Sequence, residues 1–307
     1  MKQGGILSPV LFCVYIDSLL SNLQGKGIGC YLGNHYAGAL AYADDICLLS
    51  PSVVALQKML DICVRYCHNH KIELNCQKSF VSVFSSCPEA TIPSLYVNRP
   101  SSNGEANQVE LPFVRDPVHL GHRLKANMRQ EVDIDHQYME FNRKANAILN
   151  TFSGCDPFCR VSLLNNFAGA FYGSQLWDLS KIEPIKVAYR KAQRKALCIP
   201  WRSHSKLIPI ITGRLPIEEQ LANRFMKFFD LCASSSDPLL SYIAESATAN
   251  PWSSFGNNFK KVKYQKFLDN CRALSEEDEN IELYGAIIKD LLSMNGWRDV
   301  VDVLCVL

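Results

Sequence analysis

Residues 39–50 read ALAYADDICLLS, and this stretch decides the fold of the N-terminal part of the chain. Two adjacent aspartates, Asp44 and Asp45, interrupt an otherwise apolar run. Leu40, Tyr42 and the apolar residues 46–49 have the pattern of two short strands, with the acidic pair at the turn between them. We therefore expect a β-hairpin that carries two carboxylates at its tip.

Two carboxylates inside an apolar segment point to a metal site. Burying the pair is costly, because desolvation and mutual repulsion both disfavour the charged forms. A cation that neutralises the pair removes both penalties, and Mg²⁺ prefers carboxylate oxygens. This is a common arrangement for phosphoryl or nucleotidyl transfer. A solvated turn is the alternative, since aspartate is frequent in turns.

The segment before the hairpin, residues 1–23, reads MKQGGILSPVLFCVYIDSLLSNL and predicts a helix. Ser8 supplies a capping hydroxyl, and Pro9 costs no hydrogen bond in a first turn. The side chains that recur with helical spacing predict its apolar face: Val10, Cys13, Val14, Asp17 and Leu20 or Ser21. Gly4 and Gly5 allow the backbone to approach a bulky ligand closely.

These two segments together resemble one enzyme family. Residues 3–9, QGGILSP, resemble the QGGxLSP signature of reverse transcriptases, and residues 42–45 resemble the YADD box of the same family at a fitting distance. The resemblance implies RNA-directed DNA synthesis by two-metal nucleotidyl transfer, with an RNA template, a DNA primer and dNTPs as partners and Mg²⁺ as cofactor. It implies that Asp44 and Asp45 are the catalytic metal ligands, with the template and nucleotide contacted by Gln3, Gly4, Gly5 and Tyr42.

Weaker matches extend the resemblance along the chain. Residues 71–84 (KIELNCQKSFVSVF) are similar to the family's segment after the catalytic hairpin, which implies that Lys78 lies near the nucleotide phosphates. An ordinary exposed lysine at a turn is the alternative. The alternation in residues 80–84 predicts a half-exposed strand. Residues 118–125 (VHLGHRLK) resemble the primer-gripping hairpin of retrotransposon polymerases through Leu120 and Gly121. Residues 143–229 resemble the helical thumb and linker of non-LTR (LINE-type) retrotransposon polymerases.

In this family a third carboxylate precedes the QGG motif, and here Gln3 is the third residue. Two-metal catalysis requires ligands that hold both ions about 3.5–4 Å apart. Asp17 is no substitute, because it lies more than two turns into the predicted helix. The resemblance therefore implies an N-terminally truncated domain, and we expect little or no polymerisation from this chain alone.

Charge is distributed unevenly although the net charge is only +2. Residues 1–122 carry 8 basic and 9 acidic side chains, residues 123–228 carry 17 and 9, and residues 229–307 carry 7 and 12. The middle block holds a basic row on one predicted helix, formed by Lys186, Arg190, Lys191, Arg194 and Lys195. Trp201 and Arg202 follow this helix. Such a row can neutralise phosphates. A solvated helix face is the alternative, and the family resemblance favours nucleic acid. Val187, Ala188, Ala192 and Ala196 are expected to face the core.

Thirteen cysteines raise the question of a zinc site. Residues 61–76 (DICVRYCHNHKIELNC) bring Cys63 and Cys67 to one-turn spacing on a predicted helix that runs from Ser52 to about Asn69. The same face carries Leu56 and Leu60, however, and a buried free cysteine behaves as a small hydrophobic side chain. We therefore favour core packing for these cysteines.

The predicted fold class is α+β: a partial right-hand polymerase palm (helix, catalytic hairpin, helix, strand) followed by a mainly helical thumb and C-terminal region. The expected domains are residues 1–125, 126–230 and 231–307. Residues 86–117 are rich in Pro, Ser, Asn and Gly and predict a loop with one strand. Residues from 129 onward predict helices with breaks near 154–157, 200 and 213–216, and two final helices separated by the acidic residues 276–279.

Three functions follow from this reading. The first is a reverse transcriptase, incomplete as an isolated chain. The second is a non-catalytic RNA- or DNA-binding remnant that uses the helices of residues 181–206, and the third is an inert retroelement fragment. The sequence shows neither a signal peptide nor an apolar stretch long enough to span a membrane. We therefore expect an intracellular protein, nuclear or cytoplasmic, that has no membrane partner.

Overall fold

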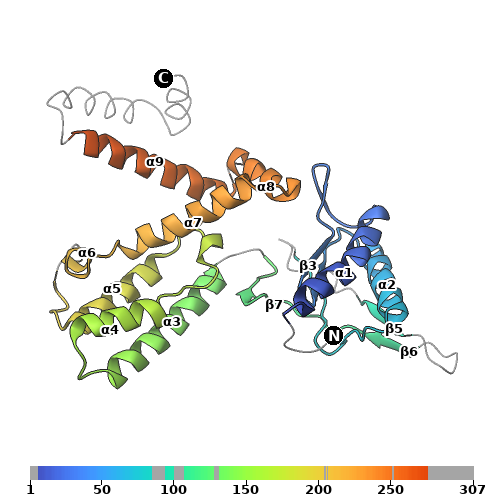
Figure 1. The fold of residues 1–307 in the computed structure, drawn as a ribbon, viewed down its shortest axis with the longest axis horizontal. Helices are drawn as coiled ribbons and strands as arrows, with labels where there is room; N and C mark the ends of the chain where they lie inside the picture. The colour runs from blue at the N-terminus through green and yellow to red at the C-terminus, as the bar shows by residue number, and fades with distance from the viewer. Residues whose placement is uncertain are drawn as a thin grey trace.

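The computed structural model describes residues 6–84, 94–99, 107–127, 131–203, 205, 207–250 and 252–275. Within these ranges the chain is a mixture of helices and four antiparallel strand pairs, which confirms the predicted α+β class. Figure 1 shows two regions, a mixed N-terminal part and a helical part, with α8 and α9 following the helical part.

The N-terminal part is built on two helices, α1 (Ser8–Gly25) and α2 (Val53–Asn69). Between them the chain forms two hairpins, β1 (Tyr31–Leu32) with β2 (His35–Tyr36), and β3 (Ala39–Tyr42) with β4 (Asp45–Leu48). Strands β3 and β4 pack through Ala39, Ile46 and Leu48 on one apolar core that joins the two helices. The buried residues of this core are Ile16, Leu19, Leu23, Met59, Ile62, Cys63 and Tyr66.

Helix α1 is present, but its predicted cap and apolar face are wrong. Leu7 occupies the N-cap position without a side-chain hydrogen bond, and Ser8 is the first residue of the helix. The predicted face is exposed, with Val10 at 61% and Val14 at 69%. Apolar residues occupy several faces of this helix, so periodicity alone does not select the buried one. Contact with α2 selects the face of Ile16, Leu19 and Leu23.

Helix α2 follows the prediction closely. Ser52 is its N-cap, and the Ser52 hydroxyl accepts a hydrogen bond from the backbone N–H of Ala55. Leu60 and Cys63 are buried, and Leu56 is partly buried against a second apolar cluster. The amphipathic pattern therefore predicts this helix and its inward face.

The segment predicted as a loop with one strand contains a hairpin instead. Strand β5 (Tyr96–Arg99) pairs with β6 (Asn107–Glu110), and Leu95 and Val97 are buried against α2. The predicted strand at residues 80–84 is reduced to a single parallel bridge between Val81 and Phe113. The predicted alternation of buried and exposed side chains is present in this segment, since Val81 is buried and Phe80 and Phe84 are exposed.

A fourth hairpin leads into the helical part. Strand β7 (Val118–His119) pairs with β8 (His122–Arg123), and α3 (Glu131–Thr151) follows. The remaining helices are α4 (Pro157–Leu163), a π-helical turn (Leu164–Ala168), a 3-10 turn (Ser174–Leu176), α5 (Glu183–Leu197), α6 (Leu207–Thr212), α7 (Ile217–Ala233), α8 (Pro238–Ala249) and α9 (Ser254–Ser275). The predicted helix breaks near 154–157, 200 and 213–216 are confirmed, and the predicted break at residues 276–279 lies outside the described residues.

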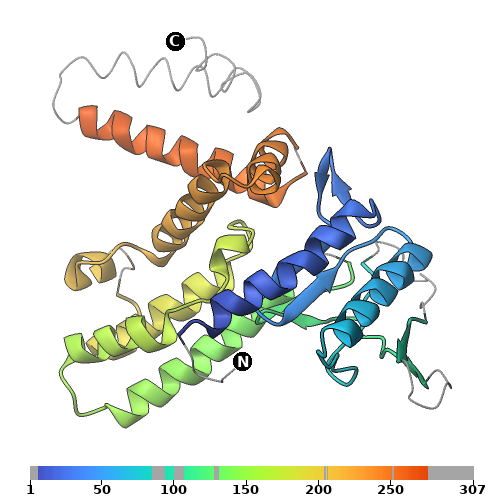
Figure 2. The ribbon, with the colours of Figure 1, turned by 45° about the vertical axis from the view of Figure 1, so that its right-hand side comes forward.

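One large apolar core holds the helical part together. Helices α3, α4 and α5 lie side by side in Figure 2, and α7 and α9 extend the same core. Trp177, Phe141 and Phe225 are among its fully buried side chains. Ala188, Ala192 and Ala196 of α5 face this core as predicted, whereas Val187 is 39% exposed and was predicted wrongly.

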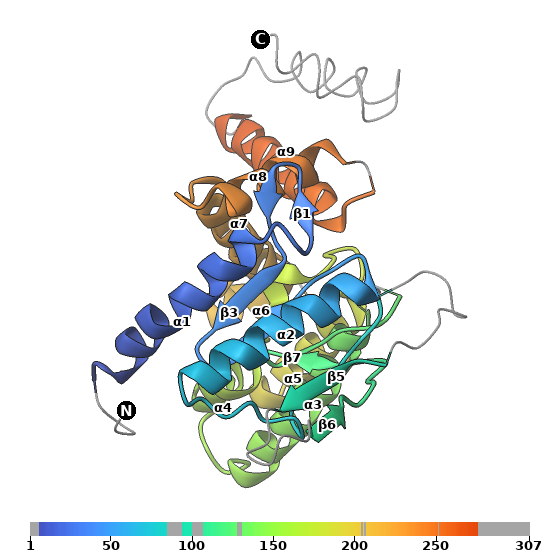
Figure 3. The ribbon, with the colours of Figure 1, turned by 90° about the vertical axis from the view of Figure 1, so that its right-hand side faces the viewer.

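The two parts meet at helix α8, which lies beside the hairpin of β1 and β2 in Figure 3. The His35 ring packs against the Tyr242 ring with centroids 5.1 Å apart. Gly33 stands at the hairpin turn with φ 58°, and a Cβ there would lie 2.8 Å from the Tyr242 ring. No helix in the described part of the chain has the length and apolar character of a membrane span.

Candidate functional site

The paired aspartates lie at the tip of the hairpin of β3 and β4. Tyr42 pairs with Asp45 as the last rung of the ladder, so Ala43 and Asp44 form a two-residue turn. Ala43 has φ 50°, in the left-handed region that disfavours residues with a Cβ. The turn therefore places the two carboxylates on neighbouring residues where the ladder ends.

The structure corrects one part of the sequence argument, because the carboxylates are not buried. Asp44 and Asp45 are exposed, and so are Tyr42 and Ala43 around them. Apolar residues of β3 and β4 contact the core at the base of the hairpin, while the tip projects from it. Both carboxylates are thus accessible to solvent and to a metal ion.

An apolar surface is exposed in the same part of the molecule. Exposed apolar side chains precede α1, occupy its first turns and lie on β3: Ile6, Leu7, Val10, Leu11, Val14, Leu40 and Tyr42. Tyr42 is 68% exposed and stands next to the turn. Tyr42 therefore does not fill the core, and its predicted contact with substrate stays a prediction.

Asp44 and Asp45 suit a hard divalent cation, because ionised carboxylates are the ligands that Mg²⁺ prefers. In the described part of the chain, no group of three or more His, Cys, Asp or Glu side chains is arranged to hold a metal ion. The hairpin thus offers two carboxylate ligands, and a two-metal centre requires others beside them.

The other residues predicted to contact substrate have different outcomes. Gln3, Gly4 and Gly5 lie outside the described residues. Lys78 is exposed in a turn whose backbone N–H donates to the Oδ1 of Asn75 at 3.2 Å. The prediction that Lys78 lies near nucleotide phosphates stays a prediction.

Leu120 and Gly121 form the turn of the hairpin of β7 and β8, as expected from their motif. Both have positive φ, 47° and 79°, which is the pattern of a type I′ turn. The Leu120 carbonyl accepts a hydrogen bond from the Tyr172 hydroxyl at 3.1 Å, and the Tyr172 ring stacks on His122. This turn is thereby fixed to the helical part of the molecule.

The basic row on α5 divides into engaged and free side chains. Lys186 pairs with Glu183 at 2.6 Å, and Arg190 pairs with Glu218 at 2.8 Å. Arg194 donates from Nε to the Ser203 carbonyl. Lys191 and Lys195 are exposed and make no ion pair with a described residue. They are the cations on this helix that are free to contact phosphate.

Exposed aromatic and guanidinium groups follow the same helix. Trp201 is 76% exposed, and the Arg202 guanidinium lies 4.8 Å from the centre of its ring. An exposed indole with a guanidinium group beside it offers a stacking surface for a nucleobase. The pair therefore adds an aromatic contact to the cations of α5.

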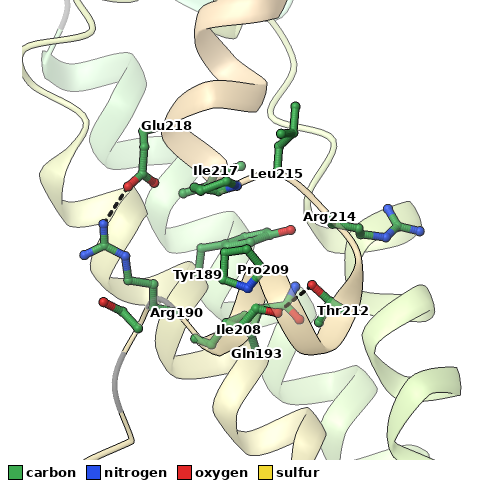
Figure 4. Close-up of a pocket in the computed structure, with 12 residues that line it drawn as sticks. Tyr189, Arg190, Gln193, Ile208, Pro209, Thr212, Arg214, Leu215, Ile217 and Glu218 are labelled. Atoms are coloured by element: carbon green, nitrogen blue, oxygen red, sulfur yellow. Dashed lines mark hydrogen bonds and ion pairs between the residues drawn. The ribbon is translucent and has the colours of Figure 1, made fainter. Parts of the chain in front are cut away.

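Sequence reasoning did not find a cavity that lies beside the basic row. It measures about 280 Å³ and lies between α5, α6 and the first turn of α7 (Figure 4). Tyr189, Gln193, Ile208, Ile217 and Glu218 line it. Arg190 is the member of the basic row that lines this cavity, and the other walls come from residues 205–218.

The cysteines considered for zinc are part of the core. Cys63 and Cys67 are buried on α2, and burial raises the pKa of Cys63 to about 12, with a smaller contribution from Cys67. A thiol held neutral at physiological pH is a poor metal ligand, because the thiolate is the binding form. The His70 ring stacks on Tyr66, and its Nδ1 lies 2.9 Å from the Tyr66 carbonyl.

Comparison with known proteins agrees with this geometry. Residues 1–116 match the family described as reverse transcriptase (RNA-dependent DNA polymerase), and this match includes the hairpin with Asp44 and Asp45. This segment is therefore similar to a reverse transcriptase domain, and it contains α1, the β3–β4 hairpin, α2, β5 and β6.

Two relatives that the chain is similar to are Pol polyproteins of R2 retrotransposable elements. The chain is 38% identical over 80 residues to the Pol polyprotein of the type-2 retrotransposable element R2DM from Drosophila melanogaster, which is 26% of this chain and 8% of that protein. It is also 38% identical over 103 residues to the Pol polyprotein of the type-1 retrotransposable element R2 from Popillia japonica, 32% of this chain and 14% of that protein. The matches thus span a small part of each relative.

Proposed function

We propose that this chain contributes the carboxylate hairpin of an RNA-directed DNA polymerase. One observation supports this proposal above the others: two adjacent, exposed aspartates at the tip of a tight hairpin, within a segment of the reverse transcriptase family. A fold alone does not specify an activity, so the argument depends on these two side chains and their position.

Asp44 and Asp45 would hold Mg²⁺, which when bound stabilises the charge on the attacking and leaving oxygens of nucleotidyl transfer. The role of the chain is positioning. The positive φ of Ala43 and the Tyr42–Asp45 rung set the direction of both carboxylates, and the base of the hairpin is anchored in the core. Tyr42, exposed beside the turn, would pack under the primer end.

The isolated chain should extend a primer weakly at most. The described residues gather no third metal-ligating side chain at the hairpin, and two-metal chemistry depends on a full ligand set. We therefore propose that activity requires a further carboxylate beside Asp44 and Asp45.

Two measurements test the catalytic proposal. The first is binding of Mn²⁺, as a spectroscopic substitute for Mg²⁺, followed by electron paramagnetic resonance. Asp44→Asn and Asp45→Asn should each weaken binding, whereas Asp17→Asn, which changes an exposed aspartate of α1, should not. Equal binding by all four proteins would refute a metal role for the hairpin.

The second measurement is primer extension on an RNA template with the purified chain and Mg²⁺. We expect extension close to background for the wild type and for Asp44→Asn alike. Robust extension that Asp44→Asn abolishes and Asp17→Asn preserves would support the catalytic role of Asp44 and overturn the proposal that a further ligand is needed.

A second function, RNA binding by the helical part, is supported by a separate observation. Lys191 and Lys195 are exposed on α5 without ion-pair partners among the described residues, and Trp201 and Arg202 are exposed close after the end of this helix. Cations and an exposed aromatic ring together are the usual means of holding single-stranded nucleic acid.

Salt-dependent binding to a fluorescent single-stranded RNA tests this second function. We expect Lys191→Glu combined with Lys195→Glu to weaken binding at every salt concentration tested. The matched control is Lys260→Glu with Lys261→Glu, two adjacent exposed lysines on α9. If the wild type does not bind RNA, the third alternative, an inert fragment, becomes the better description of the helical part.

A further inference from the structure

The guanidinium group of Arg160 is buried in the helical part without a carboxylate partner. Arg160 lies on α4, is 7% exposed and forms no ion pair with a described residue. Its Nε is buried and makes no hydrogen bond among the described residues. A buried charge without a counter-ion is unfavourable, and arginine does not lose its proton in proteins. The surroundings of Arg160 therefore lack one negative charge.

This guanidinium contacts a thiol. The Arg160 Nη2 donates a hydrogen bond to the Sγ of Cys198 at 2.9 Å, which joins α4 to the end of α5. No acidic residue occurs in residues 157–177 or 184–217, the segments around the two side chains. The Cys198 sulfur is therefore the atom in position to carry the missing negative charge.

Cys198 is accessible to a small reagent, although Arg160 is not. Cys198 is exposed, and it is the C-cap residue that follows the last residue of α5. Its φ is 55°, and its backbone N–H donates to the carbonyls of Arg194 and Lys195. This left-handed conformation, uncommon for a residue with a Cβ, ends the helix at Cys198. Cys198 thus combines exposure to solvent with a contact to a buried cation.

Exposure together with a neighbouring cation is typical of a reactive cysteine. The thiolate is the nucleophilic form of cysteine, and a neighbouring arginine stabilises negative charge on sulfur. An ionised sulfur at Cys198 would supply the counter-ion that Arg160 lacks. Oxidation of cysteine by peroxides follows thiolate character and exposure, so both conditions for it meet at this position.

We propose that Cys198 is a site of reversible oxidation by hydrogen peroxide, and that Arg160 is the group that activates it. The Cys198 thiolate attacks one peroxide oxygen, so that an S–O bond forms and the O–O bond breaks. The leaving hydroxide takes a proton from solvent and becomes water. Sulfur loses two electrons, peroxide gains them, and the product is a sulfenic acid, the reversible stage of cysteine oxidation. This inference is independent of the proposed polymerase and RNA-binding functions.

The first test compares two exposed cysteines within the wild-type protein. The reduced chain is treated with hydrogen peroxide in the presence of dimedone, which traps sulfenic acids, and labelling is followed by peptide mass spectrometry. We expect Cys198 to be labelled about tenfold faster than Cys155, since one hydrogen bond to a charged group is worth about this factor. Equal labelling rates at the two positions would overturn the proposal.

A second measurement on the wild-type protein separates charge from accessibility. Iodoacetate and iodoacetamide both alkylate thiolates and are similar in size, but only iodoacetate is an anion. Attraction to the Arg160 guanidinium should raise the iodoacetate-to-iodoacetamide rate ratio at Cys198 above the ratio at Cys155. Faster reaction at Cys198 with the same ratio at both cysteines would attribute the reactivity to exposure alone and overturn the role of Arg160.

Substitutions of Arg160 assign the effect to its charge. Arg160→Met removes the charge and keeps an unbranched side chain, so dimedone labelling of Cys198 should fall to the rate at Cys155, whereas Arg160→Lys should retain part of the difference. Arg143→Met, at an exposed arginine of α3, is the control and should leave the Cys198 rate unchanged. Circular dichroism checks folding, and fast labelling of Cys198 in folded Arg160→Met would overturn the proposal. If neither Arg160 variant folds, the two wild-type measurements decide.

Discussion

The indole Nε1 of Trp177 donates a hydrogen bond to the Oδ2 of Asp133 at 2.8 Å, inside the core of the helical part. Asp133 is 6% exposed and also accepts from the backbone N–H of Arg123 through Oδ1, at 3.2 Å. The His122 ring lies 3.6 Å from the same carboxylate. One buried aspartate of α3 therefore joins the hairpin of β7 and β8 to the core of the helical part.

Removal of the Trp177 N–H should destabilise the protein. Trp177→Phe retains an aromatic ring and removes one donor from a buried carboxylate, so we expect a loss of about 1–3 kcal/mol in the free energy of unfolding. Urea denaturation measures this loss. Trp252→Phe is the control, since Trp252 is 91% exposed and its replacement should change stability by less than about 0.5 kcal/mol. Similar effects of both substitutions would contradict a special role for the Asp133 contact.

The turn between β7 and β8 should require glycine at position 121. Gly121 has φ 79°, and a Cβ there would lie 3.1 Å from the Tyr172 ring. A residue with a Cβ costs roughly 1–2 kcal/mol in the left-handed region, so Gly121→Ala should lower stability by about that amount. Gly25→Ala, at the last residue of α1 with open space around it, should be neutral or stabilising by up to about 1 kcal/mol. Thermal denaturation distinguishes the two.

Replacement of Asp44 should affect chemistry without affecting folding. Asp44 is exposed in a turn, so Asp44→Asn should change the free energy of unfolding by less than about 0.5 kcal/mol. Calorimetry in the absence of divalent metal checks this. A large stability change would mean that any loss of metal binding in this variant reflects disturbed structure rather than a lost ligand.

The lysines of α5 should contribute unequally to RNA binding. Plotted against log salt concentration, log affinity falls with a slope whose magnitude should be about 0.7 smaller for Lys191→Ala and for Lys195→Ala. This is the expected contribution of one phosphate contact on a single strand. Lys186→Ala should change the slope less, because Lys186 is paired with Glu183 at 2.6 Å. Equal slopes for all three variants would refute the division into free and engaged cations.

Stability should fall in alkaline solution because of Cys63. Burial raises its pKa to about 12 in the folded protein, whereas an unfolded cysteine has a pKa of about 8.5. Between these values the unfolded state ionises first and is favoured as pH rises. The stability contributed by the neutral thiol is therefore full below about pH 8.5 and declines by about 1.4 kcal/mol per pH unit above it.

Comparison of variants isolates this contribution. Cys63→Val removes the thiol and keeps a similar volume, so the difference in stability between pH 8 and pH 10 should be about 2 kcal/mol smaller than in the wild type. Cys155→Val, at an exposed cysteine, should preserve the wild-type pH dependence. The measurement is urea denaturation at both pH values under reducing conditions.

Local patterns were sufficient for the elements whose burial follows a single periodicity. Helix α2 begins after Ser52 and buries Leu60 and Cys63 as its pattern predicts. The hairpin tip at Asp44 was predicted because strand and turn propensities change over a few residues. The positive φ of Leu120 and Gly121 likewise agrees with a motif read as a turn.

Predictions failed where more than one face or pairing was available. Helix α1 has apolar residues on several faces, and only its contact with α2 selects Ile16 and Leu19 over Val10 and Val14. The strands β5 and β6 are separated in sequence by residues rich in turn formers, and their pairing depends on packing of Val97 against α2. Such choices depend on contacts between distant segments, which no local pattern contains.

The sequence alone determined the resemblance to reverse transcriptases, the α+β class, the carboxylate hairpin at Asp44 and Asp45 and the basic row of α5. These features depend on residue types within one segment, where propensity, periodicity and motif spacing act directly. The tertiary structure decided which cations of that row are free and that Gln193 and Glu218 share one cavity. It also decided that Asp133 joins the hairpin of β7 and β8 to the helical part. The physical reason is that ion pairing, burial and cavity formation depend on groups that only folding brings together.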